Sequence, residues 1–248
     1  MTIHVPQDKV DKALNLIDNM LKAKKVTLRT IQCLAGLLNF LTKVIKCGRV
    51  FLRRIYNLSK GLRFATQHVK VSYEARCDLR AWKFFLQKFN GSAIIAPINW
   101  NNPDFHIYSD ASGFAFAVVF NNKWMQGIFP DEWSKKSIAI RELVPVFLAM
   151  VAWHMEFQNS TIVFHVDNQS VVNMLNSQTS PDPILLAMLR KIIVISMLHN
   201  IVFISQYIPG KMNIVSDHLS RLQVDKARQT QPGLEKEPEK ILETWLPW

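Results

Sequence analysis

The chain has 248 residues, 49% of them hydrophobic and 10% aromatic, a composition that supports a packed core and excludes general disorder. Its three cysteines form no CxxC pair and no Cys/His zinc spacing, so we expect a reduced, intracellular protein without disulfides, in the nucleus or the cytoplasm. The longest apolar stretch, residues 143–153, is shorter than the ~18 residues of a membrane span, and no leader follows Met1, so no membrane association is expected.

The net charge of +11 is concentrated at one end of the chain. Residues 1–90 hold 18 Lys/Arg against 5 Asp/Glu, which leaves 12 against 14 for residues 91–248. No carboxylate occurs between Asp18 and Glu74. Such a one-sided run favours a polyanionic partner, although a solvated helical surface is the alternative. Charge alone does not distinguish DNA, RNA and an acidic protein.

The first 92 residues are predicted to form a small basic all-α module. Apolar residues repeat at helical spacing from Val10 to Leu21, and Thr27 is a candidate cap for a second helix through Leu41. A third helix is expected over residues 72–89.

From residue 93 the pattern changes to strands separated by helices. Strands are expected at residues 105–110, 114–120, 124–129, 161–166 and 201–208, and helices at 138–157, 169–176, 184–199 and 213–222. Strands separated by helices pair in parallel through right-handed crossovers. The prediction for residues 93–222 is therefore an α/β domain with a five-stranded mixed sheet flanked by helices. Residues 223–248 are predicted to be a flexible tail.

Four carboxylates occupy special places in this layout. Asp110 ends the first strand, Glu142 lies early on the first long helix, Asp167 ends the fourth strand and Asp217 opens the last helix. Ligands usually bind where neighbouring parallel strands end, and carboxylates gathered there repel one another unless cations lie among them. Oxygen ligands without cysteine favour Mg²⁺ or Mn²⁺, and two such ions support phosphodiester hydrolysis.

Each carboxylate also has an ordinary structural explanation. Asp110 could be a turn residue, Asp167 a helix cap, Asp217 a favourable charge at a helix start and Glu142 an acid in a first turn capped by Ser137. The occurrence of all four, in order and on suitable elements, favours the metal site.

At these residues the sequence resembles a known family. SDASG, ELVPVFLAMVAW, FHVDNQSVVNMLNS and QYIPGKMNIVSDHLSRL resemble the ribonuclease H domain of reverse transcriptases, most closely those of DIRS-type retrotransposons. Upstream, VTLRTIQCLAGLLNFLTKVIKCGRVFLRRIYNLS and EARCDLRAWKFFL are similar to the segment that joins polymerase to nuclease, so the resemblance covers roughly residues 5–222.

The resemblance implies a ribonuclease H-like fold and hydrolysis of the RNA strand of RNA/DNA hybrids. It gives Asp110, Glu142, Asp167 and Asp217 catalytic and metal-binding roles toward two Mg²⁺ ions, for which Mn²⁺ can substitute. It also implies the polymerase portion of a longer reverse transcriptase as partner and leaves the oligomeric state open. No polymerase motif is visible, and the loop before the last helix offers Lys211 and Asn213 where many cellular members have a histidine, so slow turnover is expected.

Nucleic-acid contacts are expected from both parts of the chain. Ser112, Asn168 and Gln169 are candidate donors to 2′-hydroxyl groups, and they could equally be helix caps. Contacts to phosphates are expected from the basic module, at Lys43, Lys46, Arg49, Arg53 and Arg54.

Three other functions compete with this interpretation. A proofreading exonuclease, transposase or integrase would share the fold, but Asp110 is not followed by a second acid in Asp-x-Glu spacing, and an integrase zinc module is missing. A catalytically silent, domesticated nucleic-acid-binding fragment remains the main alternative. A purely structural helical partner would leave the four carboxylates unexplained.

Overall fold

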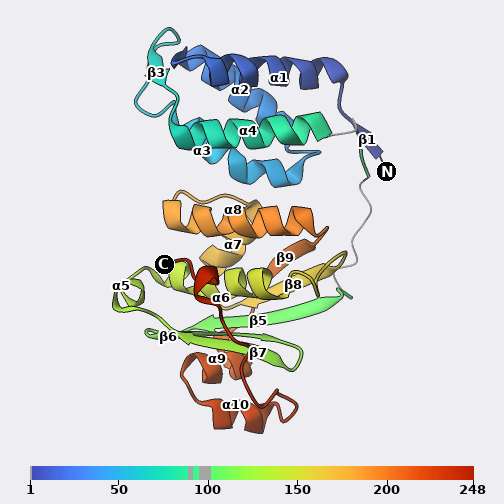
Figure 1. Cartoon of the computed structure of the whole chain (residues 1–248), viewed down its shortest axis with the longest axis vertical. Coiled ribbons are helices and arrows are strands. Elements are labelled where there is room, and N and C mark those ends of the chain that lie inside the picture. The colour runs from blue at the N-terminus through green and yellow to red at the C-terminus, as the bar shows by residue number, and fades with distance from the viewer. Residues whose placement is uncertain (1, 89–91, 95–101) are drawn as a thin grey trace. The chain divides into compact units, whose positions relative to one another are not determined.

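The structure, a computed structural model, describes residues 2–88, 92–94 and 102–248 (Figure 1). The chain divides into two compact units, Met1–Ile98 and Asn99–Trp248. The division follows Ile98, whereas the sequence placed it after residue 92.

The first unit is helical, with two short antiparallel strand pairs, β1 with β4 and β2 with β3, that the all-α prediction missed. Strands of three residues carry too little alternation to be seen in sequence. The predicted third helix ends at Lys88 in the structure, and residue 89 lies outside the described residues. The elements are β1 (Thr2–His4), α1 (Gln7–Lys22), β2 (Lys25–Thr27), α2 (Leu28–Leu41), the 3₁₀ helix η1 (Lys46–Phe51), α3 (Arg53–Asn57), β3 (His68–Lys70), α4 (Tyr73–Lys88) and β4 (Ser92–Ile94).

Polar contacts fix how these helices end and pack. Thr27 caps α2 by accepting from the backbone N–H of Thr30, as predicted. Arg76 on α4 donates to the carbonyl oxygen of Ala23 at 2.7 Å, so it satisfies the C-terminal end of α1. A side chain at Gly48 would come within 2.4 Å of the ring of Trp82, so glycine allows η1 to lie against that buried ring.

The second unit contains the predicted five-stranded mixed sheet, with strand order β7-β6-β5-β8-β9. β5 pairs antiparallel with β6 and β6 with β7, whereas β5, β8 and β9 run parallel. This sheet with flanking helices confirms the predicted α/β architecture of a five-stranded mixed sheet. The strands are β5 (Phe105–Ala111), β6 (Ala115–Phe120), β7 (Lys123–Ile128), β8 (Thr161–Val166) and β9 (Val202–Tyr207).

Helices cover both faces of this sheet (Figure 1). α6 and α7 lie on one face, with α8 packed against α6, and α9 contacts β5, β6 and β7 on the other face, with α10 packed against α9. The predicted helix over residues 138–157 ends at Trp153, and Pro145 lies inside it. The helices are α5 (Asp131–Ser134), α6 (Ile138–Trp153), α7 (Gln169–Ser177), α8 (Pro183–Leu198), α9 (Ile214–Ser220) and α10 (Val224–Thr230), with 3₁₀ helices η2 (Gly210–Met212) and η3 (Glu243–Trp245). Within the described chain, no helix is long and apolar enough to cross a membrane.

The segment after Gln223 packs on the sheet, which corrects the prediction of a flexible tail. Leu234 is buried against Trp124 on the face covered by α9 and α10. Backbone N–H groups of Glu235 and Glu239 donate to the carbonyl oxygens of Asn122 and Trp124, along β7 at the edge of the sheet. The Glu/Lys-rich composition hid this packing, because bonds between backbone groups do not depend on side-chain type.

Candidate active site

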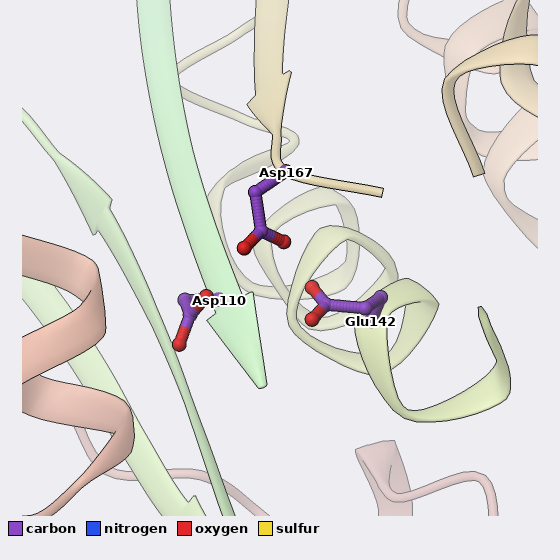
Figure 2. A group of neighbouring side chains, drawn as sticks. All are labelled: Asp110, Glu142 and Asp167. Carbon is purple, nitrogen blue, oxygen red and sulfur yellow. The ribbon is translucent and has the colours of Figure 1, made fainter. Parts of the chain in front are cut away.

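Three of the four predicted carboxylates meet where β5 and β8 end (Figure 2). One oxygen from each of Asp110, Glu142 and Asp167 lies within 4.8 Å of the others. The parallel register sets Ser109 of β5 beside Val166 of β8, so Asp110 and Asp167 follow at the same edge. Glu142 comes from α6 and points toward Asp167.

Burial and mutual repulsion make these carboxyl groups hard to ionise without a cation. Asp110 is 5% exposed and Glu142 3%. Burial, reinforced by the charges of Asp110 and Asp167, raises the pKa of Glu142 to about 9. Burial also raises the pKa of Asp110 to about 6, against the hydrogen bond from Ser220, and burial raises that of Asp167.

Asp217 lies beside this group rather than within it. It is on α9, its side chain is 33% exposed, and its Oδ1 accepts from Nε of Arg221 at 2.8 Å. Its negative charge nonetheless raises the pKa of both Asp110 and Asp167. The structure therefore places Asp217 within electrostatic reach of the three carboxylates and pairs it with an arginine.

The donor set fits a divalent metal ion. Oε2 of Glu142 is buried and has no hydrogen-bond partner among the described residues, and the carboxyl group of Glu142 points toward Asp167. Buried oxygens rarely remain without a partner. Three carboxylates that repel one another form an oxygen-only ligand set, which is what hard cations prefer. Asp110, Glu142 and Asp167 could therefore bind a metal.

Polar residues that the sequence did not single out position this group. Ser220 on α9 donates its hydroxyl to Oδ2 of Asp110. Asn213, only 2% exposed, donates to the carbonyl oxygen of Ser109 at 2.9 Å, and Ser216 donates to Asn213 at 2.6 Å. These bonds tie the start of α9 to β5 beside Asp110. The polar spacing in NIVSDHLS was the available sequence signal.

Two further contacts shape the loops around the site. Arg141, the residue before Glu142, donates from Nη1 to the carbonyl oxygen of Ser112 at 2.7 Å and so holds the β5–β6 turn. A side chain at Gly210 would lie 3.3 Å from Oδ2 of Asp167, so the β9–α9 loop runs close to that carboxylate. Glycine at this position permits the approach.

The predicted contacts to 2′-hydroxyl groups have local partners. The hydroxyl of Ser112 accepts from the N–H groups of Phe114 and Ala115 at 3.3 and 2.9 Å, which forms the turn after β5. Asn168 is the N-cap of α7. Gln169 is exposed and donates to Asn173, one turn along α7, at 3.1 Å. Asn168 therefore has the capping role that the sequence left open, whereas Ser112 forms a turn rather than a helix cap.

The residues predicted to contact phosphates differ in how exposed they are. Lys43 and Arg49 are exposed, whereas Arg53 and Arg54 are half-buried. Arg54 lies 3.7 Å from the buried carboxylate of Asp78, so part of its charge serves the fold. The side chain of Lys46 lies outside the described residues.

Comparisons with known proteins found similar solved structures but no related sequence. No protein-family model matches the sequence, and no curated protein matches it. LC11-RNase H1 in complex with an RNA/DNA hybrid matches with a TM-score of 0.42 and 18% identity, over 50% of this chain and 99% of that one. RNase H1 from Halobacterium salinarum NRC-1 gives 0.39 and 15%, over 49% and 98%. The foamy viral protease-reverse transcriptase in complex with an RNA/DNA hybrid gives 0.30 and 16%, over 96% of this chain and 29% of that one.

Proposed function

We propose that this chain hydrolyses the RNA strand of RNA/DNA hybrids, with Asp110, Glu142, Asp167 and Asp217 holding two Mg²⁺ ions. Mn²⁺ is expected to substitute. The observation that carries the proposal is the group of three carboxylates at the sheet edge, with one oxygen from each within 4.8 Å of the others, in which Oε2 of Glu142 is buried and has no hydrogen-bond partner in the described part of the chain. When bound, the two ions would activate a water for attack on a phosphodiester and neutralise charge on the leaving oxygen.

The side chains of this protein would supply position and charge for that chemistry. Ser220 holds Asp110 in place, and α6 keeps Glu142 fixed in a buried setting. Asp217, at the edge of the group, would complete the ligand set by turning from Arg221. Fixed, buried carboxylates need little rearrangement to bind a cation, which favours tight and well-oriented binding.

The motifs shared with DIRS-type elements support a place for this activity within a retrotransposon-derived reverse transcriptase. The polymerase portion of such an enzyme would then be the natural partner. Co-purification of this chain with a polymerase segment from the same element tests that part of the proposal.

Cleavage of a labelled RNA/DNA hybrid in Mg²⁺ tests the activity, with RNA duplex and DNA duplex as controls. We expect loss of the hybrid's RNA strand alone, abolished by Asp110→Asn and by Glu142→Gln. Asp104→Asn is the matched control, because Asp104 precedes the same strand at its other end and bonds only to Thr161 among the described residues. The control should cleave like the wild type.

The catalytically silent binding fragment is the second candidate. The observation that favours it is the ion pair between Asp217 and Arg221, which occupies one carboxylate of the expected metal set. If the wild type and Asp110→Asn were equally inert while hybrid binding survived, the nuclease proposal would fail and the binding function would stand.

A further inference from the structure

A small two-stranded element of the first unit gathers positive charge at one end of the helices. β2 and β3 pair antiparallel, and the pairing continues as the N–H of Arg29 donates to the carbonyl oxygen of Ala65 at 3.1 Å. Figure 1 shows β3 and its loop at one end of α1 and α4. We define the β2–β3 surface as the exposed side chains of Lys24, Lys25, Arg29, Arg63, Phe64, His68 and Lys70.

The register of this pair places like charges together. Lys25 lies directly opposite Lys70, and Thr27 opposite His68. Like charges directly opposite across a strand pair destabilise it. Among the described residues no carboxylate pairs with either lysine, and the sequence has none between Asp18 and Glu74. The arrangement opposes folding and is therefore suited to an external anion.

The loop before β3 presents an aromatic ring beside these bases. Oε1 of Gln67 accepts from the backbone N–H groups of Arg63 and Phe64 at 2.6 and 2.9 Å, so the loop has a built conformation. Phe64 is 67% exposed within it. Exposed aromatic rings among Lys and Arg are typical of surfaces that bind nucleic acids. On a duplex, whose bases are already stacked, such a ring would contact the sugar edge of the backbone.

We propose that the β2–β3 surface binds the sugar–phosphate backbone of a nucleic-acid duplex. This surface differs from the one expected at η1 and α3, where Arg54 pairs with Asp78 and Arg53 is half-buried. The choice of an RNA/DNA hybrid as the duplex rests on the proposed function. The phosphate contacts themselves do not depend on the carboxylates of the second unit.

Binding of a fluorescent RNA/DNA hybrid to the full chain, in EDTA and over a series of salt concentrations, tests the inference without any cleavage. The variant is Lys25→Gln/Lys70→Gln, and the matched control is Lys9→Gln/Lys12→Gln, which removes the same charge at two exposed lysines on α1. Each phosphate contact contributes about one unit to the slope of log affinity against log salt. We expect the slope to fall by about two units in the variant and to stay near the wild-type value in the control.

Two further measurements separate lost contacts from lost structure. Because the variant relieves repulsion, its unfolding temperature should equal or exceed that of the wild type. Lys25→Arg/Lys70→Arg keeps the charge and should bind like the wild type. Wild-type salt dependence in the Gln variant, or equal losses in variant and control, would overturn the inference.

An acidic protein partner is the competing occupant, and polyglutamate tests it. If labelled polyglutamate bound the wild type but not the Gln variant, while both proteins bound the hybrid equally, the surface would belong to an acidic protein. Weakened binding in the Gln variant together with an absence of cleavage by the wild type would retain this surface and refute only the nuclease.

Discussion

Removing the charge of Asp110 should stabilise the metal-free second unit. Burial and the neighbouring carboxylates raise the pKa of Asp110 from an ordinary value of 3.8 to about 6. At about 1.4 kcal/mol per pKa unit, the ionised side chain costs about 3 kcal/mol at pH 7. Asn at this position keeps an oxygen that can accept from Ser220. We therefore expect Asp110→Asn to raise the unfolding temperature of this unit by roughly 5–10 °C in EDTA.

The pH dependence of this difference follows from the direction of the shift. A buried acid with a raised pKa binds its proton more tightly when folded, so its favourable contribution exists below the unfolded value and is lost as pH rises. Wild type and Asp110→Asn should unfold at similar temperatures near pH 4. The gap should widen as the pH rises toward the folded pKa of about 6.

Differential scanning calorimetry at pH 4 and pH 7, first in EDTA and then in Mg²⁺, measures both effects. Asp104→Asn is the control, and it should lower the unfolding temperature rather than raise it. Asp104 accepts from the N–H and the hydroxyl of Thr161 at 2.6 and 2.7 Å, and these bonds lower its pKa. Mg²⁺ should stabilise the wild type far more than Asp110→Asn. A variant that melts at or below the wild type in EDTA at pH 7 would refute the repulsion argument, and equal Mg²⁺ effects would refute the ligand role.

Three other substitutions probe the surroundings of the site and the sheet edges. Ser220→Ala removes the hydroxyl that holds Asp110 and should weaken Mg²⁺ binding by about 10- to 100-fold, measured as the Mg²⁺ dependence of unfolding. Leu234→Ala should lower the free energy of unfolding by about 2–4 kcal/mol in urea, because the side chain is buried against the sheet. Asn176→Ala should lower it by about 1–3 kcal/mol, because the Asn176 amide pairs with both backbone groups of Ser205 on edge strand β9 at 2.8 Å.

Matched substitutions in the same segments are controls for the stability losses expected from Leu234→Ala and Asn176→Ala. Leu242→Ala alters a leucine that is 44% exposed and should change stability far less than Leu234→Ala. Asn173→Ala, on α7, removes only the exposed contact to Gln169 and is the counterpart of Asn176→Ala. Equal losses from Leu234 and Leu242 would mean that the C-terminal segment does not pack as described.

The sheet and the core of the site were accessible from sequence because each depended on a local pattern. Apolar runs separated by helices fix a parallel arrangement, and parallel strands end at the same edge. Asp110 and Asp167 follow such runs directly, so their proximity needed only the register. Glu142 required the further inference that α6 packs on the sheet, and α6 contacts β5 and β6 in the structure.

The features that sequence did not reveal depend on contacts between distant segments. The attachment of α9 to β5 beside Asp110 depends on Asn213 bonding to Ser109, a contact across 104 positions. Asparagine suits both nucleic-acid contact and helix capping. Because α7 begins at the next residue, the side chain of Asn168 caps that helix. Short strands such as β2 and β3 are fixed by pairing rather than by composition, and so is the opposition of Lys25 and Lys70.

The two charged regions follow the same physical logic with opposite signs. Asp110, Glu142 and Asp167 are buried together against their mutual repulsion, and Lys25 faces Lys70 against theirs. Folding alone selects against both arrangements, since each lowers stability unless an ion or polyanion of opposite charge is present. A metal ion among the carboxylates and phosphates along the lysines would each convert this cost into binding energy. The stability measurements above therefore test function. A variant that is more stable than the wild type without the ligand should no longer be more stable when the ligand is supplied.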